Sequence, residues 1–472
     1  MLFSSFTFIL LFLPVFFAFY LAFPQQARSY VVVLFSCIFY AWWRVDFLVL
    51  ILAISAITYA IGYRLERTID KPRKLLLWIG VGANLATLGY FKYEGMVAET
   101  LNVLMHDFGI SWSLAPSAPI LPIGISFHVF QSISFLVDLY RRETTLSKRP
   151  IDFAAFSLLF PQLIAGPVVK YKDIAPQLIA PLISVDNILK GAVIFAIGLS
   201  KKVLIADSIV PIVDYSFGLS NPSFLEAWTG AIAYAMQLFF DFSGYTDMAI
   251  GIALAMGIIF PRNFDDPYLS RSIAEFWRRW HMSLSSWLRE YLYIPLGGNR
   301  KGTGRTYFNL MTTMTLGGLW HGASWTFALW GAWHGLLLTV ERAPGRPVVP
   351  RVQSAKLPLV LSIAATFFLV TLGWILFRAS TLQGAISMFA GTVGVNGFAV
   401  SDFAWIAIPN SAWVTFALAL LLCFAVAPWR RAHASVERAV QRSLAVFALP
   451  LFVLSIFRLV SESTRPFLYF QF

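Results

Sequence analysis

The sequence predicts an all-α, polytopic integral membrane protein, a helical bundle of about eleven spans. Hydrophobic residues make up 58% of the chain and charged residues only 13%, whereas soluble globular proteins carry about 25% charged residues. The apolar residues form runs long enough to cross a bilayer as helices. Short clusters of Lys and Arg separate these runs, as they do in cytoplasmic loops. We therefore expect residues 1–472 to form a single membrane domain.

The net charge of +12 does not indicate nucleic-acid binding, because the basic residues lie in short clusters between apolar runs. Cys37 and Cys423 both lie inside apolar runs. They form neither a disulfide framework nor the ligand spacing of a zinc site. We expect the lipid bilayer as a partner surface, and we expect no metal and no nucleic acid.

The charges of the loops predict the orientation of the chain. Residues 64–74, 141–149 and 299–305 are basic and should face the cytoplasm. Residues 94–119 contain Glu and Asp but no Lys or Arg, so we expect a loop on the opposite side. Residues 201–202 are both Lys and are predicted to form another cytoplasmic loop between two spans.

Two stretches do not fit simple spans. Residues 151–169 contain two prolines and a glycine in an apolar run, which predicts a broken, re-entrant element. Along residues 270–294, apolar side chains recur at helical spacing opposite polar ones. That pattern predicts one amphipathic helix lying at the membrane interface.

Residues 308–340 hold no Lys, Arg, Asp or Glu, yet they contain His321 and His334 among five glycines. An ionisable side chain in hydrocarbon is costly, so such a residue usually has a function. The stretch exceeds the roughly 20 residues that one span needs, and the glycines interrupt it. We therefore expect a broken element that lines a cavity, with His321 near the bilayer midplane.

His321 is the favoured candidate for acid–base chemistry, because imidazole changes charge near neutral pH. The alternative is a neutral imidazole held by backbone groups. His334 would lie on a different face of a continuous helix and is the weaker candidate. His281 lies at the edge of the apolar face of residues 270–294, where it is either functional or a side chain that reaches water. For His128, a hydrogen-bonded packing role is favoured.

Familiar motifs of soluble enzymes are missing, including a nucleophile elbow, a zinc-protease helix and a P-loop. Residues 297–305 nevertheless combine four glycines with Arg300, Lys301 and Arg305. Glycines expose backbone N–H groups, and the basic side chains could meet phosphates. The alternative, which spacing alone favours, is a flexible cytoplasmic loop.

Six stretches of the chain resemble the membrane-bound O-acyltransferase (MBOAT) family, and within it the branch that serves bacterial alginate O-acetylation. The likeness extends from the N-terminus to about residue 340, with the signature region at about 120–340, and the helices of 357–472 fall outside it. The six stretches are FYAWWR (39–44), FPQLIAGP (160–167), FDFSGYTDMA (240–249), WRRWHMSLS (277–285), YLYIPLGGNR (291–300) and GLWHGASW (318–325).

The resemblance implies a helical bundle with a tunnel through the bilayer. It implies that His321 is catalytic and that His281 is the second signature histidine. It also implies a cytoplasmic acyl donor, acetyl-CoA in the acetylating branch. We assign Trp320 to the donor-binding residues, together with the three basic residues of the 297–305 loop.

The resemblance further implies a multi-pass protein of the bacterial inner membrane. In its polysaccharide systems, a periplasmic partner with a serine-hydrolase-like (SGNH) fold completes transfer to an extracytoplasmic polysaccharide. His128 stands where an aromatic residue is expected, which leaves the polymer open. Acetylation of peptidoglycan or cellulose and D-alanyl transfer to teichoic acid are alternatives. A polysaccharide or lipid transporter is the alternative from another class, but the chain shows no internal repeat.

Overall fold

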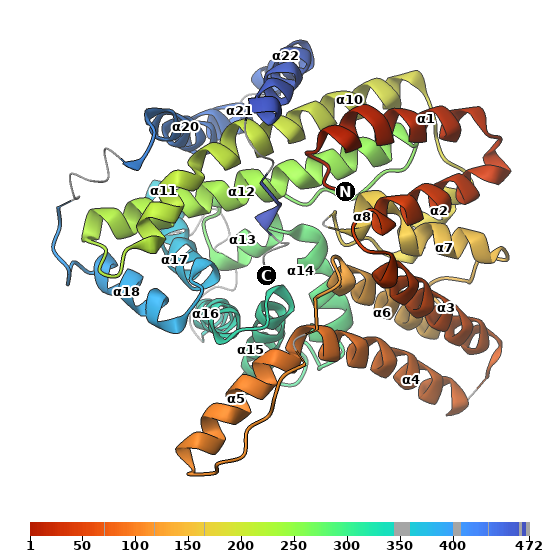
Figure 1. Cartoon of the computed structure of the whole chain (residues 1–472), viewed down its shortest axis with the longest axis horizontal. Coiled ribbons are helices and arrows are strands. Elements are labelled where there is room, and N and C mark those ends of the chain that lie inside the picture. Colours follow the sequence, from red (N-terminus) through yellow and green to blue (C-terminus); the bar gives the residue numbers. More distant parts are fainter. Residues whose placement is uncertain are drawn as a thin grey trace. The chain divides into compact units, whose positions relative to one another are not determined.

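The computed structural model confirms the all-α prediction, since every regular element in the described part of the chain is a helix (Figure 1). The described residues are 1–69, 71–117, 119–164, 166–343, 359–399, 407–432, 434–461 and 465–468. Within them, five helical stretches are long and apolar enough to cross a membrane: Val45–Arg67, Lys71–Asp107, Phe224–Ala255, Leu359–Arg378 and Asn410–Arg431. The count of about eleven spans stays a prediction.

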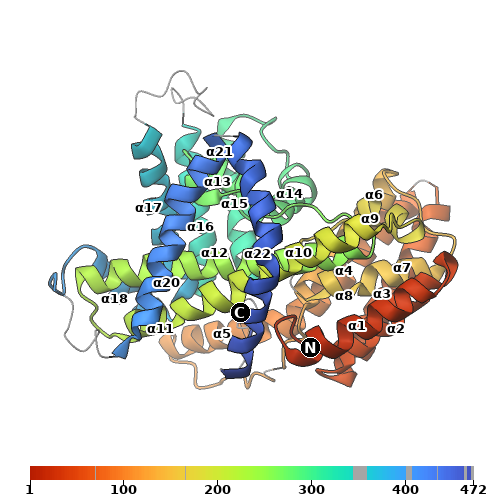
Figure 2. The same ribbon diagram turned by 90° about the horizontal axis from the view of Figure 1, so that it is seen from above.

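The chain divides into two compact units. One comprises Met1–Ala192 with Ala249–Pro261, and the other comprises Val193–Met248 with Arg262–Phe472. The chain passes between the units three times: inside α10 (Val185–Ser200), inside α12 (Phe224–Ala255), and between Pro261 and Arg262, where there is no helix. Helix α12 has 32 residues, and it runs beside α10 in Figure 2. The expected single membrane domain over residues 1–472 stays a prediction.

The first unit is built from helices of different lengths around a phenylalanine cluster. Phe160 packs against Phe12 and Phe16, with ring centroids 5.2 and 5.0 Å away. Apart from its shares of α10 and α12, the unit contains α1 (Leu13–Ala22), α2 (Gln25–Ala41), α3 (Val45–Arg67), α4 (Lys71–Leu88), α5 (Glu94–Asp107), α6 (Ile125–Arg141), α7 (Pro150–Leu158), α8 (Phe160–Leu163) and α9 (Tyr171–Ile179).

Two predictions about this unit have different outcomes. The predicted break within residues 151–169 is confirmed, because the helix stops at Leu159 between α7 and α8. Its re-entrant course stays a prediction. The loop predicted at residues 94–119 is wrong for its first half, since Glu94–Asp107 is α5. Met, Ala, Glu and Leu favour helix there, and no proline follows until residue 116.

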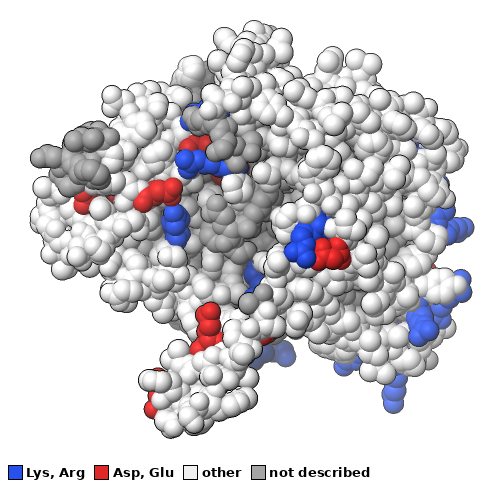
Figure 3. All heavy atoms as spheres, viewed as in Figure 1, with Lys and Arg blue, Asp and Glu red and all other residues white. Residues whose placement is uncertain are grey.

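The second unit holds residues 193–248 and 262–340 of the signature region. Besides parts of α10 and α12 it contains η3 (Lys201–Ala206), α11 (Asp207–Gly218), η4 (Pro267–Leu269), α13 (Ile273–Arg279), α14 (Met282–Leu288), η5 (Arg289–Tyr293), α15 (Thr303–His321), α16 (Trp325–Glu341), α17 (Leu359–Arg378), α18 (Leu382–Thr392), α20 (Asn410–Leu421), η6 (Leu422–Val426), α21 (Ala427–Ala432) and α22 (Ala434–Ser461). On the face drawn in Figure 3, Lys, Arg, Asp and Glu are few and most of the surface is uncharged.

The prediction of a cytoplasmic loop at residues 201–202 is wrong. Helix continues without a break through α10, η3 and α11. Lys202 is only 2% exposed, and its Nζ lies 2.6 Å from Asp207 Oδ1 and 2.8 Å from Asp241 Oδ1. The lysine is therefore paired inside the protein, where partners of opposite charge offset the cost of burying it.

The single amphipathic helix predicted for residues 270–294 is also wrong. The segment forms α13, α14 and η5, and the first two are separated at Trp280 and His281. His281 takes a left-handed backbone conformation with φ 43°. A conformation of this kind costs about 1–3 kcal/mol for a residue other than glycine, so the surroundings must hold it.

The break predicted within residues 308–340 is confirmed, because α15 ends at His321 and α16 begins at Trp325. The two helices pack closely through glycines. A Cβ at Gly318 would lie 2.2 Å from the carbonyl oxygen of Phe327, and one at Gly331 would lie 2.2 Å from that of Met314. Backbone lies against backbone there, so His321 is placed by the close approach of α15 and α16.

We predict that Gly331→Ala moves α15 away from α16 and lowers thermal stability, because overpacking a tight contact typically costs about 1–3 kcal/mol. The matched control is Gly82→Ala in α4, where nothing lies within 4 Å of the added Cβ. That control should be neutral or slightly stabilising. The measurement is the melting temperature of each purified variant in the same detergent. Equal melting temperatures of the two variants would contradict the prediction.

Candidate active site

The second unit brings His281 and His321 together. Their ring centroids are 6.2 Å apart, and the two residues are 0% and 4% exposed. His281 precedes α14, and His321 is the last residue of α15. Of the two alternatives for His281, a side chain that reaches water is therefore wrong, since the side chain is fully buried.

Asn263 fixes the imidazole of His281. Asn263 Oδ1 lies 3.1 Å from the backbone N–H of Ser283 and 3.2 Å from Nδ1 of His281. Because a backbone N–H can only donate, this atom of Asn263 is the carbonyl oxygen and not the amide nitrogen. His281 must then donate through Nδ1–H. In the neutral ring, Nε2 keeps the lone pair and can act as a base.

The same asparagine holds the strained turn. The backbone N–H of Met282 donates to the backbone oxygen of Asn263 at 2.9 Å, and Ser283 Oγ donates to Asn263 Oδ1 at 2.9 Å. Asn263 is 1% exposed. These bonds offset the cost of the left-handed conformation and thereby stabilise the turn that buries His281.

Aromatic rings surround His321. Trp320, Trp330 and Phe377 lie with ring centroids 5.0, 5.1 and 5.3 Å from its imidazole. Trp320 also lies 6.2 Å from His281. Trp330 Nε1 is buried and has no hydrogen-bond partner among the described residues. Two imidazoles in an apolar enclosure can move a proton at a substrate hydroxyl, and a buried N–H can donate to an oxyanion.

The predicted donor loop lies at the other end of α15. Arg300, Lys301 and Arg305 are exposed, and the loop begins at Gly297 and Gly298, whose φ values are 115° and 57°. The 19 residues of α15 span about 27 Å at 1.5 Å per residue. The structure therefore places Trp320 with the histidines and separates it from the three basic residues.

Asn309 anchors this loop to α15. It is fully buried, and its Nδ2 donates to the carbonyl oxygen of Gly298 at 2.8 Å. The loop leads directly into α15, which begins at Thr303. A helix N-terminus presents backbone N–H groups and positive potential, so the exposed basic side chains stand where an anion is favoured.

The other candidate histidines lie elsewhere. His334 is fully buried on α16, and its Nδ1 lies 3.3 Å from Nε1 of Trp277. His128 is fully buried in the first unit. Its Nε2 lies 3.3 Å from Ser55 Oγ, which in turn lies 2.9 Å from Ser157 Oγ. These contacts agree with the favoured packing role of His128.

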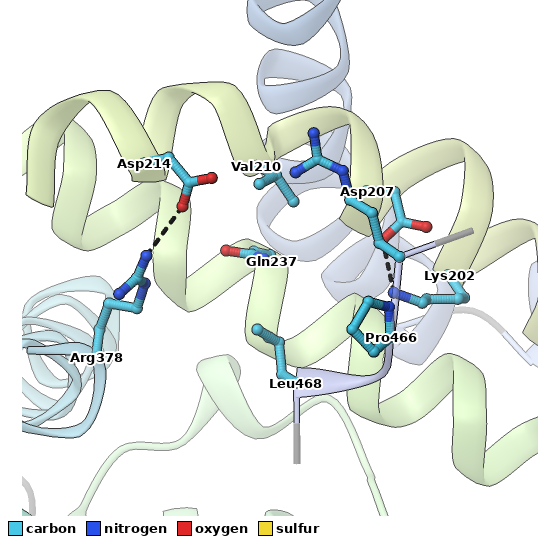
Figure 4. A pocket seen from close by; sticks show the side chains of 9 residues that line it. Lys202, Asp207, Val210, Asp214, Gln237, Arg378, Pro466 and Leu468 are labelled. Carbon is cyan, nitrogen blue, oxygen red and sulfur yellow. Dashed lines mark hydrogen bonds and ion pairs between the residues drawn. The ribbon is translucent and has the colours of Figure 1, made fainter. Parts of the chain in front are cut away.

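A polar cavity that sequence analysis missed lies within the second unit (Figure 4). Its volume is about 280 Å³. Gln237 Oε1 is buried and has no hydrogen-bond partner among the described residues. The lining residues are Lys202, Asp207, Val210, Asp214, Gln237, Arg378, Arg465, Pro466 and Leu468. Charged residues within apolar runs of the sequence could have indicated this cavity. The cavity was missed because Lys202 was assigned to a loop.

One turn of α12 separates this cavity from the histidines. Asp241 pairs with Lys202, and its Oδ2 accepts the backbone N–H of Leu468 at 3.0 Å. The next residue, Phe242, packs edge-on against His281 at 4.7 Å. Helix α12 thus contributes to both the cavity and the enclosure of the histidines.

Ion pairs hold the segment that carries Asn263. Asp266 Oδ2 lies 2.7 Å from Arg430 Nη2 and 2.6 Å from Arg431 Nε. Burial alone would raise the pKa of Asp266, but the hydrogen bonds and charges of Arg431 and Arg430 outweigh burial and lower it. The carboxylate stays ionised at neutral pH and ties α21 to this segment.

Comparison with known proteins assigns the family. Residues 6–350 match the model of the membrane-bound O-acyltransferase family, MBOAT. The chain belongs to this family. The resemblance found in the sequence is thereby confirmed, and so are the predictions of an O-acyltransferase and of a multi-pass membrane protein.

Individual relatives are similar over most or all of their length. The probable alginate O-acetylase AlgI of Pseudomonas putida is 44% identical over the whole of both chains. The protein of the same name from Azotobacter vinelandii is 42% identical, again over the whole of both chains. The peptidoglycan O-acetyltransferase of Helicobacter pylori is 38% identical over 84% of this chain and 80% of its own.

We predict that Asn263→Leu inactivates this MBOAT protein and lowers its melting temperature. Leucine has a similar volume but leaves Nδ1–H of His281 and the backbone N–H of Ser283 unpaired, at about 1–3 kcal/mol each. Ser283→Ala is the matched control, because it removes the hydroxyl bond to the same oxygen and keeps the backbone N–H bond. That variant should lose about 1 kcal/mol or less and keep most activity. Equal activity of the two variants would refute the prediction.

Proposed function

We propose that this chain is the membrane subunit of a polysaccharide O-acetylation system, with alginate as the polymer. In this proposal it takes an acetyl group from acetyl-CoA in the cytoplasm and moves it to the outer side of the inner membrane. A periplasmic partner with an SGNH-type, serine-hydrolase-like fold then completes transfer to the polysaccharide. The observation that carries the proposal is the pair of buried imidazoles, His281 and His321, from two MBOAT motifs.

The arrangement suits acyl transfer from a thioester. His321 accepts the proton of an acceptor hydroxyl while the hydroxyl oxygen forms a bond to the acyl carbon. The lone pair on Nε2 of His281 is a second acceptor beside that proton, and the Nε1–H of Trp330 donates to the oxyanion. When the C–S bond breaks, the leaving thiolate takes the proton from His321. The imidazole returns to its neutral form, and the protein ends with the charge with which it began.

In this proposal the 297–305 loop holds the phosphates of the donor. The loop is basic and exposed, and it leads into the N-terminus of α15. Those features fit anionic groups. The thioester end must then travel along α15 towards His321, and Trp320 lines the inner end of that route.

We also propose the finer architecture that the sequence predicts. About eleven spans, including broken or re-entrant ones, enclose a tunnel through the bilayer. The loops at 64–74, 141–149 and 299–305 face the cytoplasm under the positive-inside rule. The described regular elements are helices, and none adds a soluble domain that could cradle a polymer, which supports a separate partner.

The relatives favour alginate over other acceptors, because two full-length relatives carry its name. Peptidoglycan is the second candidate, favoured by the Helicobacter pylori relative. Cellulose and the D-alanylation of teichoic acid would use the same imidazole chemistry. Transfer of labelled acetyl groups from acetyl-CoA to alginate and to peptidoglycan, with the partner present, separates these candidates. Labelled peptidoglycan without labelled alginate would overturn the choice of polymer.

We predict that His321→Asn lowers acyl transfer by about 10² to 10⁴-fold, the usual loss when a general base is removed. Asparagine keeps hydrogen-bonding atoms but cannot take up a proton near neutral pH. The measurement is release of free thiol from acetyl-CoA in membranes that also contain the partner and polymer.

The matched control is His128→Asn, which makes the same change at an equally buried histidine in the first unit. This variant should keep turnover within a few-fold of wild type. Near-normal turnover of His321→Asn would show that the imidazole is structural. A loss in His128→Asn as large as that in His321→Asn would show that the assay reports damage to folding.

We predict that replacing Arg300, Lys301 and Arg305 together with Gln raises the apparent KM for acetyl-CoA about tenfold at low salt. Exposed charges each contribute up to about 1 kcal/mol, and salt screens them, so the effect should shrink as ionic strength rises. The control replaces Arg64, Arg67 and Lys74 with Gln, an equal change of charge in another basic loop. An unchanged KM in the first variant, or equal changes in both, would show that residues 297–305 do not bind the donor and form only a cytoplasmic loop.

A further inference from the structure

His334 is the buried histidine that the proposed reaction does not use. It is 0% exposed on α16. Phe276 stacks on its ring at 6.1 Å and 10°, and Trp277 and Trp330 meet it edge-on at 5.2 Å. An imidazole in such an aromatic enclosure needs a hydrogen-bond partner to offset the loss of water.

That partner fixes the tautomer of His334. Trp277 Nε1, which can only donate, lies 3.3 Å from His334 Nδ1. Nδ1 therefore carries the lone pair, and in the neutral ring the proton is on Nε2. Nε2 lies against α17, where a Cβ on Gly373 would be 3.0 Å away. A Cβ at position 373 would make a tight contact with the imidazole, so glycine there leaves the ring in its place.

The bond joins two elements that carry the proposed site. Trp277 lies on α13, four residues before His281. Trp330 lies between His321 and His334, with its ring 5.1 Å from the first imidazole and 5.2 Å from the second. A shift of His334 therefore affects the enclosure of His321 through Trp330 and the position of His281 through α13.

Helix α16 holds α13 at a second point. Glu341 accepts the backbone N–H groups of Ile273 at 2.5 Å and of Ala274 at 3.0 Å. A carboxylate at a helix N-terminus satisfies N–H groups that lack intrahelical partners. Glu341 thus fixes the start of α13, and His334 fixes its middle, one turn before the strained turn at His281.

We propose that His334 is a positioning residue for acyl transfer. Its Nδ1 accepts the indole N–H of Trp277 and thereby sets α13, and with it His281, relative to His321. The inference rests on the proposed function, because the distance that it controls matters only if both histidines serve one reaction. His334 takes no part in proton transfer, since Nε2 faces the backbone of α17 and Nδ1 is occupied by Trp277.

The test uses substitutions that separate the acceptor from the ring. His334→Asn places a carbonyl oxygen close to the position of Nδ1 and keeps the acceptor. His334→Phe keeps an aromatic ring without an acceptor, and Trp277→Phe removes the donor. We expect kcat to fall three- to tenfold in His334→Phe and in Trp277→Phe, with the KM for acetyl-CoA unchanged. We expect His334→Asn to retain at least half of wild-type kcat.

The double variant completes a thermodynamic cycle. If the bond positions His281, Trp277→Phe combined with His334→Phe should be no slower than either single variant, because each removes the same interaction. Multiplying losses would overturn the inference. So would wild-type kcat in Trp277→Phe, or a loss in His334→Asn equal to that in His334→Phe. If His334→Phe does not fold, Trp277→Phe and His334→Asn still decide the question.

Failure of the proposed function gives a different result. If wild-type protein with its partner transfers no acetyl group, the proposed function fails before any variant is compared. If wild type is active and His321→Asn is inactive while the cycle is additive, only the positioning role fails. Melting temperatures of all variants confirm that kcat is compared among folded proteins.

Discussion

The carboxamide oxygen of Asn263 is the interaction on which the proposed site depends. It accepts hydrogen bonds from the ring of His281 and from the backbone and hydroxyl of Ser283. One atom therefore stabilises a strained backbone turn and selects the imidazole tautomer. Without it, the turn between α13 and α14 would lose the side-chain bonds that offset its strained backbone conformation.

Sequence could predict the histidines but not what holds them. His321 is recognisable because it is ionisable in a charge-free apolar stretch, and both histidines lie in family motifs. Asn263 lies 18 residues before His281, and Trp277 lies 57 residues before His334. No periodicity links such pairs, because their contact depends on how helices pack in three dimensions. Asn263 and Trp277 could therefore be identified as site residues only from the structure.

The failed loop at residues 201–202 shows the limit of a rule that counts charges. The positive-inside rule assigns stretches rich in Lys and Arg to cytoplasmic loops, so it places both lysines of residues 201–202 outside the membrane. Lys202 instead meets Asp207 five residues along its own helix and Asp241 on α12. Sequence contains both aspartates, but only the structure shows that α12 brings the distant one into contact. Because it is paired, Lys202 lines a polar cavity inside the second unit and does not mark a loop.

The charged Lys202 and the histidines of the second unit are buried in different ways, because only the histidines must change charge. Permanent charges such as Lys202 are buried only with partners of opposite sign, since an isolated ion in an apolar interior is very costly. The histidines are enclosed by aromatic rings, where an imidazole is least costly in its neutral form. A neutral imidazole can accept a proton for the lifetime of an intermediate and return it to a leaving group. An acyl transfer in which the protein starts and ends uncharged at the reacting groups is therefore well suited to a membrane interior.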